Sequence, residues 1–229
     1  GLLASFAIPR RPAAAPGSPF PWWGPLDTLR VLNQARADRL LTVVILADGV
    51  VWLVATLQVL AINRIGMNQL HLGEKATSSL VVAELCGVAV GGGLCSLLAQ
   101  GERWYRVLAP AGALLTAAAL AVASLPLLGV AEPTHVLYLA LFVAGAAGGL
   151  LLVPLESFIQ SRPAAERKGQ TIAAANFTAF IGILLAGLGS VALERLPLAT
   201  SSFALIAAVT LALTLWLMSV LRRDEVTRA

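Results

Sequence analysis

The chain is organised around residues 150–182, which have the sequence LLLVPLESFIQSRPAAERKGQTIAAANFTAFIG. In this stretch a short charged loop, Gln160 to Gln170, separates two apolar segments, and the second segment is rich in alanine and carries one asparagine. A soluble helical hairpin would carry a polar stripe every three or four residues on both arms, and these arms carry almost none. The stretch therefore predicts two membrane spans joined by a loop.

The whole chain of 229 residues has the composition of a polytopic membrane protein. Hydrophobic residues make up 58% of it and charged residues 12%, whereas ordinary globular domains carry about 25% charge. The mean hydropathy is +0.84. The net charge is +4, but the sixteen Lys and Arg residues are dispersed among short loops and form no basic face for nucleic acid. We therefore predict that the chain contacts the lipid bilayer and not nucleic acid.

Six apolar segments are each long enough to cross a hydrocarbon core of about 30 Å. They predict an all-α membrane protein in which residues 40–221 form a bundle of six transmembrane helices. The predicted spans are residues 40–62, 76–99, 107–130, 135–159, 171–193 and 201–221.

The flanking segments predict three further parts of the chain. Residues 1–8 are apolar and are interpreted as the end of a preceding transmembrane helix. Residues 9–39 begin with a proline-rich connector and are interpreted as a cytoplasmic linker, in which residues 26–39 form an amphipathic helix on the membrane surface. Residues 222–229 are interpreted as a cytoplasmic tail.

The distribution of Lys and Arg predicts the orientation of the bundle. Thirteen of these residues fall in one set of segments, 1–39, 100–106, 160–170 and 222–229. Three fall in the alternate set, 63–75, 131–134 and 194–200. Because short loops rich in Lys and Arg stay in the cytoplasm, both ends of this segment are predicted to be cytoplasmic. An even number of spans is then required, and six satisfies the requirement.

Small residues recur every four positions in three of the spans, a pattern that is typical of closely packed transmembrane helices. We expect these faces to be contacts between helices. They are Ala83, Gly87, Gly91, Cys95 and Ala99 in the second span, Ala144 and Gly148 in the fourth, and Gly182, Ala186 and Ser190 in the fifth.

Two acidic residues lie inside the predicted spans. Asp48 lies about 12 Å into the first span, and Glu84 about 12 Å into the second from the opposite side, at 1.5 Å per residue. A charged side chain at the bilayer centre costs at least about 2.5–3.5 kcal/mol unless it faces a cavity or a partner, so both are predicted to be functional. The alternative is a hydrogen bond to a neighbouring helix, worth about 0.6 kcal/mol on average.

Three further side chains join the two acids as candidates for substrate binding or proton coupling. Trp52 shares the helical face of Asp48, and Gln58 lies further toward the outside. Asn176 lies in the fifth span, inside the stretch quoted at the start.

The loop after the fourth span and the residues beside it supply candidates for gating. They are Glu156, Arg162, Arg167 and Lys168. The predicted spans themselves contain no Lys or Arg, whereas a carrier of a strongly anionic solute would place such a residue near the midplane. The predicted substrate is therefore amine-bearing, amphipathic or neutral.

The order VPL…IQ.RP…E.KG..IAA.NF….G within residues 150–182 resembles the loop between the tenth and eleventh helices of major facilitator transporters. It is most similar to the bacterial lysophospholipid transporter family and to the transporter halves fused to glycerophospholipid acyltransferases. The resemblance implies the C-terminal six-helix half of such a transporter, with an N-terminal six-helix half as its partner. It also implies movement of lysophospholipids, such as the ethanolamine type, across the bacterial inner membrane by alternating access.

Residues 91–112 resemble the segment that joins the eighth and ninth helices of the same superfamily. Trp104 and Tyr105 stand where the family tends to carry an acidic-apolar-glycine run, and we interpret them as anchors at the membrane interface. Two alternatives to lysophospholipid transport remain open. One is a proton-coupled exporter of small amphipathic solutes, and the other is a membrane module that serves a fused or associated glycerophospholipid acyltransferase.

The sequence contains no motif for catalysis or metal binding. There is no G-x-S-x-G, H-E-x-x-H or P-loop motif, and neither His71 nor His135 has the aspartate four residues on that marks glycerolipid acyltransferases. Cys86 and Cys95 lie on opposite sides of one predicted helix, so they are interpreted as small buried residues. We therefore predict no enzyme activity, no cofactor and no metal site.

Overall fold

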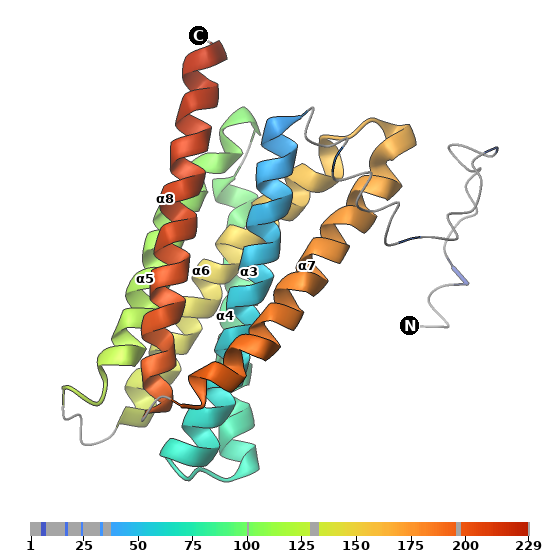
Figure 1. Cartoon of the computed structure of the whole chain (residues 1–229). Helices are drawn as coiled ribbons and strands as arrows, with labels where there is room; N and C mark the ends of the chain where they lie inside the picture. Colours follow the sequence, from blue (N-terminus) through green and yellow to red (C-terminus); the bar gives the residue numbers. More distant parts are fainter. Residues whose placement is uncertain are drawn as a thin grey trace.

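The computed structural model describes residues 38–99, 101–128, 133–195 and 198–228, together with positions 6, 7, 17, 24 and 33. Within these ranges the bundle is helical and contains no strand (Figure 1). The helices are α3 (Arg39–Arg64), α4 (Glu74–Leu98), α5 (Leu108–Ser124), α6 (Pro133–Ser161), α7 (Ala165–Leu193) and α8 (Ser202–Arg228), with short turns η1 (Ile65–Gln69), η2 (Gly101–Val107) and η3 (Ala199–Ser201). Six helical segments are long and apolar enough to cross a membrane, which confirms the predicted fold class.

The N-terminal predictions lie almost entirely outside the described residues. This applies to the preceding helix end over residues 1–8 and to the linker with its amphipathic helix over residues 9–39, of which only the last two residues join the bundle. At the other terminus, the predicted tail continues α8 as far as Arg228.

Both ends of the described bundle lie on the same side of it. The start of α3, the turn η2, the α6–α7 loop and the end of α8 lie at the top of Figure 1, and the ends of α3, α5 and α7 lie at the bottom. We call these the inner end and the outer end, after the predicted orientation. The shared end agrees with the even number of spans that the charge distribution requires.

The six helices form two interleaved groups of three. Helices α3 and α6 are central, and each packs against three or more of the others. Helix α4 packs chiefly on α6, and α7 packs chiefly on α3, while α5 and α8 pack on each other. If α3, α4 and α5 are exchanged for α6, α7 and α8 in order, the same pairs of helices remain in contact. Because three is an odd number, the second group runs through the bundle in the opposite direction, as in an inverted repeat.

Helices α4 and α7 are the edges of the bundle. In each, 28% of the most apolar window is buried, against 56% in α3. Their uncovered faces carry large apolar side chains, such as Leu85 and Val90 on α4 and Phe180 and Leu184 on α7. The prediction that Cys86 is buried is wrong for the same reason, because this thiol lies on the uncovered face of α4 while Cys95 is buried.

Glycines allow α4 and α6 to approach backbone to backbone. A Cβ atom on Gly87 would collide with the backbone of Phe142, and one on Gly91 would collide with the backbone of Ala146. The predicted small-residue face of α4 is therefore confirmed at these two positions.

The face predicted on α6 is confirmed as a helix contact at Ala144, which packs in the core, and is wrong at Gly148. The residues that meet α4 are Gly145 and Gly149, whose added Cβ atoms would strike the α4 backbone, whereas Gly148 has open space around it. Ala144 is buried in the core. Spacing by four does not distinguish two adjacent faces of a helix, since both carry small residues here.

The contact between α3 and α7 also depends on glycine. Gly182 lies against the backbone of Gly49, and Gly49 in turn lies against Thr178. This confirms the predicted α7 face at Gly182, and Ala186 one turn later is also buried.

Prolines change the lengths of two loops from those predicted. The loop between α6 and α7 is shorter, and the loop after α5 is longer. Helix α6 ends at Ser161 since Arg162 precedes Pro163, and a residue before proline is disfavoured in a helix. Helix α7 then starts at Ala165, so Arg167 and Lys168 lie on its first turns and not in a loop. In the third span the helix ends at Ser124, near Pro126, earlier than the predicted residue 130.

Candidate functional site

Asp48 is a buried acid on the central helix α3. Its side chain is 1% exposed, and its Oδ1 atom has no hydrogen-bond partner among the described residues. It lies about 15 Å inward from Asp38, where α3 begins, at 1.5 Å per residue. A carboxylate without a partner at that depth is costly, so Asp48 is the prime candidate that the structure retains.

Glu156 lies on α6, the other central helix, and is half-buried. The sequence interpretation placed it at the edge as a gating residue. In the structure α6 packs against α3, and Glu156 acts as a like charge on the carboxyl of Asp48. The bundle therefore brings together a residue predicted for substrate or proton binding and one predicted for gating.

Glu84 and Gln58 are buried elsewhere. Glu84 on α4 is 6% exposed, and Gln58 on α3 is 4% exposed. Glu84 Oε2 and Gln58 Nε2 each lack a hydrogen-bond partner within the described part of the chain. Sequence reasoning missed one further buried group without a partner, the hydroxyl of Thr77, which lies against Gly66 at the outer end. A threonine in a helix gives no signal of this kind, since its hydroxyl usually bonds its own backbone.

Trp52 and Asn176 do not join Asp48 in one enclosed site. Trp52 is half-buried, and its backbone carbonyl accepts a hydrogen bond of 2.8 Å from the Thr56 hydroxyl. Asn176 is exposed on α7, on a face that no other described helix covers. A role for Asn176 therefore requires a surface from outside the described bundle.

An ion pair joins the inner ends of α3 and α6. Arg162 Nε lies 2.8 Å from Asp38 Oδ2, and Asp38 Oδ1 accepts a hydrogen bond of 3.1 Å from the Leu41 amide as the N-cap of α3. The Arg162 guanidinium also lies 5.7 Å from the centre of the Phe158 ring. Arg162 was predicted as a gating residue, and Asp38 was missed although an aspartate before an apolar run is a helix-start signal.

The surroundings of Asp38 change its acidity. Desolvation by partial burial works to raise the pKa of this carboxyl, but the hydrogen bonds from Arg162 and the Leu41 amide together lower the pKa below its ordinary value. The carboxylate is therefore the favoured form in the folded protein.

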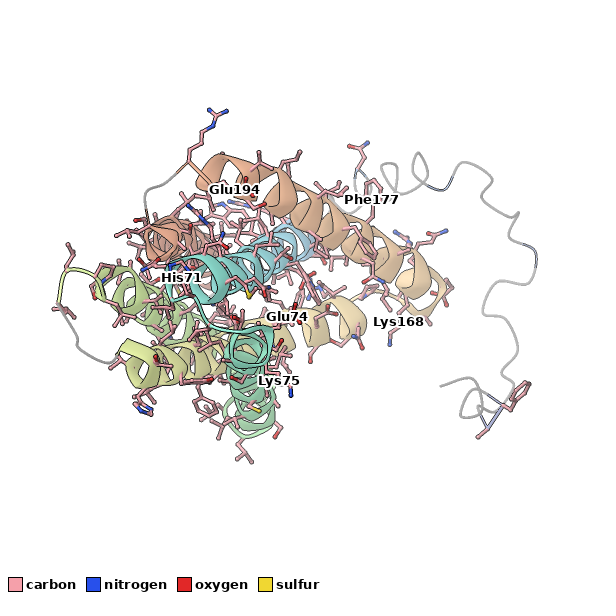
Figure 2. The ribbon with its side chains drawn as sticks, turned by 90° about the horizontal axis from the view of Figure 1, so that it is seen from below. His71, Glu74, Lys75, Lys168, Phe177 and Glu194 are labelled. Atoms are coloured by element: carbon pink, nitrogen blue, oxygen red, sulfur yellow. The ribbon has the colours of Figure 1, made fainter. Side chains whose placement is uncertain are left out.

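The remaining gating candidates lie apart from this ion pair. Arg167 and Lys168 are exposed on the first turns of α7. Figure 2, seen from the outer end, shows Lys168 and Glu194 at opposite ends of α7, which runs obliquely across the bundle. The positions of Arg167 and Lys168 suit contacts with solvent or lipid headgroups at the inner end.

At the outer end, side chains of α3 and η1 hold the neighbouring helix ends. Arg64 donates hydrogen bonds to the backbone carbonyls of Leu193 and Glu194, the second at 3.1 Å, and so caps the C-terminus of α7. Gln69 Oε1 accepts a hydrogen bond of 3.1 Å from the Thr200 amide. These contacts tie α3 to α7 and to the start of α8.

Two cavities lined by described residues lie near the helix ends. One of about 590 Å³ at the outer end is bounded by α3, η1, α7 and the start of α8, and its lining includes Leu57, Asn63 and Ser190. The other, of about 370 Å³ at the inner end, lies between α4 and α6 beside Cys95 and Trp104. Trp104, predicted as an interfacial anchor, packs on Phe158 with 4.8 Å between the ring centroids and 31° between the ring planes. Neither cavity is lined by Asp48 or Glu84.

The described residues contain no group of three or more His, Cys, Asp or Glu side chains that could hold a metal ion. Comparison with known proteins then adds one finding. A protein-family model described as Major Facilitator Superfamily matches residues 1–187. No curated protein and no solved structure matches the chain.

Proposed function

We infer that this chain, which belongs to the Major Facilitator Superfamily, is the C-terminal six-helix half of a secondary transporter. The family model covers well over half of the 229 residues, and the six membrane-spanning helices have the swapped three-plus-three packing of a transporter half. The protein is therefore a multi-pass membrane protein. Its proposed mechanism is alternating access against a second half.

The proposed partner is an N-terminal six-helix half that covers α4 and α7. Both helices leave most of their apolar windows uncovered. Lipid could cover the leucines and valines, but these faces also carry bare glycines with open space around them, Gly93 on α4 and Gly187 on α7. Small residues favour contact with another helix, and the exposed Asn176 on α7 would gain a polar partner there.

The proposed substrate is a lysophospholipid with an amine-bearing headgroup. The observation that carries this proposal is the enclosed carboxyl of Asp48 on the central helix, in bundle spans whose predicted apolar segments contain no Lys or Arg. A carboxylate there suits an ammonium group. The resemblance of residues 150–182 to lysophospholipid transporters supports the same substrate class, and with it a place in the bacterial inner membrane with both ends of this segment cytoplasmic.

The test is uptake of labelled lysophospholipids by proteoliposomes that contain the full-length transporter. We expect lysophosphatidylethanolamine to enter faster than in protein-free vesicles, and an N-acylated analogue without the positive charge to enter at least tenfold more slowly than the amine. Uptake no faster than in protein-free vesicles would contradict the proposed substrate.

A proton-coupled exporter of small amphipathic solutes is the second candidate. It is favoured by the buried carboxyl of Asp48, whose Oδ1 atom lacks a hydrogen-bond partner among the described residues, because a proton would neutralise it. Efflux of small amphipathic amines that stops when the proton gradient is collapsed, without lysophospholipid uptake, would select this candidate.

A further inference from the structure

We propose that Asp48 of α3 and Glu156 of α6 form one shared site for a single positive charge, reached from the inner end of the bundle. The charge is a proton, a sodium ion or the ammonium group of the substrate. This proposal rests on the transporter function proposed above and assigns to Glu156 a binding role instead of a gating role.

The burial of Asp48 is the first observation. The side chain is 1% exposed, and the helix on either side of it is lined by buried apolar residues such as Ile45 and Val51. Its Oδ1 atom accepts no hydrogen bond within the described part of the chain. A buried polar atom without a partner is rare in native proteins and calls for an explanation such as a missing ion.

The depth of the two carboxyls is the second observation. The 2.8 Å ion pair between Asp38 and Arg162 places the inner ends of α3 and α6 at the same level. At 1.5 Å per residue, Asp48 then lies about 15 Å and Glu156 about 9 Å from that level, so they differ by about one helical turn. The two helices pack against each other. The half-buried Glu156 therefore lies at an intermediate depth, between the inner end and the enclosed Asp48.

The charges on the surrounding helices are the third observation. Among the described side chains, Glu156 is the charged group that acts on Asp48. Helix α7, which packs against α3, has its charged residues Glu166, Arg167 and Lys168 at its start, at the inner end. Residues 202–221 of α8 include no ionisable side chain. On α4, Glu84 lies toward the outer end.

Glu156 acts as a like charge on Asp48, and no basic side chain among the described residues acts on Asp48, so a state with both carboxyls ionised is disfavoured. One bound cation relieves that repulsion and also supplies the partner that Asp48 Oδ1 lacks. Loss of either carboxyl should then abolish the same binding event, because both belong to one site.

The decisive experiment is a double-mutant cycle in the full-length transporter. Asp48→Asn, Glu156→Gln and the double variant are reconstituted, and initial rates of lysophosphatidylethanolamine uptake are compared. We expect each single variant to lose at least tenfold and the double variant to lose no more than the weaker single variant. Losses that multiply, or a wild-type rate in either single variant, would overturn the shared site. The exposed acid Glu166 at the same end is the matched control, and Glu166→Gln should keep the wild-type rate.

Binding measurements identify the charge and separate this proposal from the transport proposal. Three measurements are made in detergent, where no transport occurs. They are proton release on a pH jump, binding of radioactive sodium, and binding of lysophosphatidylethanolamine compared with that of its N-acylated analogue. One of the three should show a single bound charge in the wild type that both single variants lose. If none does while uptake is normal, the shared site is wrong and the transport function stands.

Folding is checked by thermal stability in detergent. Asp48→Asn removes a buried charge of the pair, so its melting temperature should equal or exceed that of the wild type. Should this variant nevertheless fail to fold, Glu156→Gln decides the outcome, because the half-buried position tolerates the change. Glu156→Asp keeps a carboxylate on the same helix and should retain part of the cation binding, whereas binding as weak as in Glu156→Gln would contradict a direct role.

Discussion

The two buried acids of the bundle, Asp48 and Glu84, have different surroundings. Asp48 lies on the central helix α3, with the second carboxyl of Glu156 in electrostatic range. Glu84 lies on the edge helix α4, where its backbone touches Gly145 of α6, and no charged side chain in the described part of the chain acts on it. Since both acids are buried, burial alone does not mark a binding site. The second carboxyl is what distinguishes the Asp48 region from the packing region around Glu84.

The largest effect is expected in the packing region itself. Gly91→Leu on α4 would drive a side chain into the backbone of Ala146, and overpacking of this kind costs about 3 kcal/mol. We expect a clearly lower melting temperature and loss of monodisperse protein in detergent. Gly93→Leu on the same helix meets open space within the described bundle and touches only the proposed surface for the N-terminal half, so it should lower the melting temperature less than Gly91→Leu does. Equal stability of the two variants would contradict the close α4–α6 contact.

The second effect is expected in the Asp48 region. Asp48→Asn keeps the size of the side chain and removes its charge, so cation-dependent uptake should fall at least tenfold, or about 1.4 kcal/mol of transition-state stabilisation. Membrane expression should stay normal. Initial uptake rates in proteoliposomes measure the change, and a rate near the wild type would reduce Asp48 to a packing residue like Glu84.

The corresponding change in the packing region should have a smaller effect. Glu84→Gln keeps hydrogen-bonding capacity, and polar contacts between transmembrane helices are worth about 0.6 kcal/mol, so uptake should fall less than threefold. Cation binding should be unchanged. Glu74→Gln, an exposed acid on the same helix, is the control. A tenfold loss in Glu84→Gln, with the control active, would mean that a second carboxyl is not what distinguishes the two regions.

The smallest effect is expected for the ion pair between Asp38 and Arg162, which joins the inner ends of α3 and α6. Asp38→Asn retains the helix cap and loses the Arg162 ion pair, whose two side chains are 39% and 33% exposed, so the cost should be about 0.5 kcal/mol or less. Because the folded state lowers the pKa of Asp38, this stabilisation is present above the unfolded pKa of about 3.9 and is lost as the pH falls through the folded value.

Urea or thermal unfolding in detergent between pH 7 and pH 3 tests this pH dependence. The difference between the wild type and Asp38→Asn should be constant near neutral pH and should shrink as the pH falls below the unfolded pKa of about 3.9. A difference that grows as the pH falls would have the opposite sign and would contradict the lowered pKa.

Much of the architecture was predictable because the bilayer imposes it. Long apolar segments must form helices in a membrane, since the backbone has no other hydrogen-bond partners there, and six segments were identified with ends that differ by a few residues. Positions Gly87 and Gly91 on α4 were predictable from their spacing. The choice between Ala144 and Gly145 on α6 was not, because both neighbours are small and only the partner helix selects one.

The sequence by itself determined the class of the protein and the residues that are costly in a membrane, Asp48 and Glu84, because hydropathy and charge are properties of single residues along the chain. Only the tertiary structure decided which of these two acids has a second carboxyl near it. The ion pair of Asp38 with Arg162 and the approach of Glu156 to Asp48 join residues of α3 and α6 that lie more than a hundred positions apart. Helix packing alone sets such distances, since a period along one helix carries no information about which face a distant helix will meet.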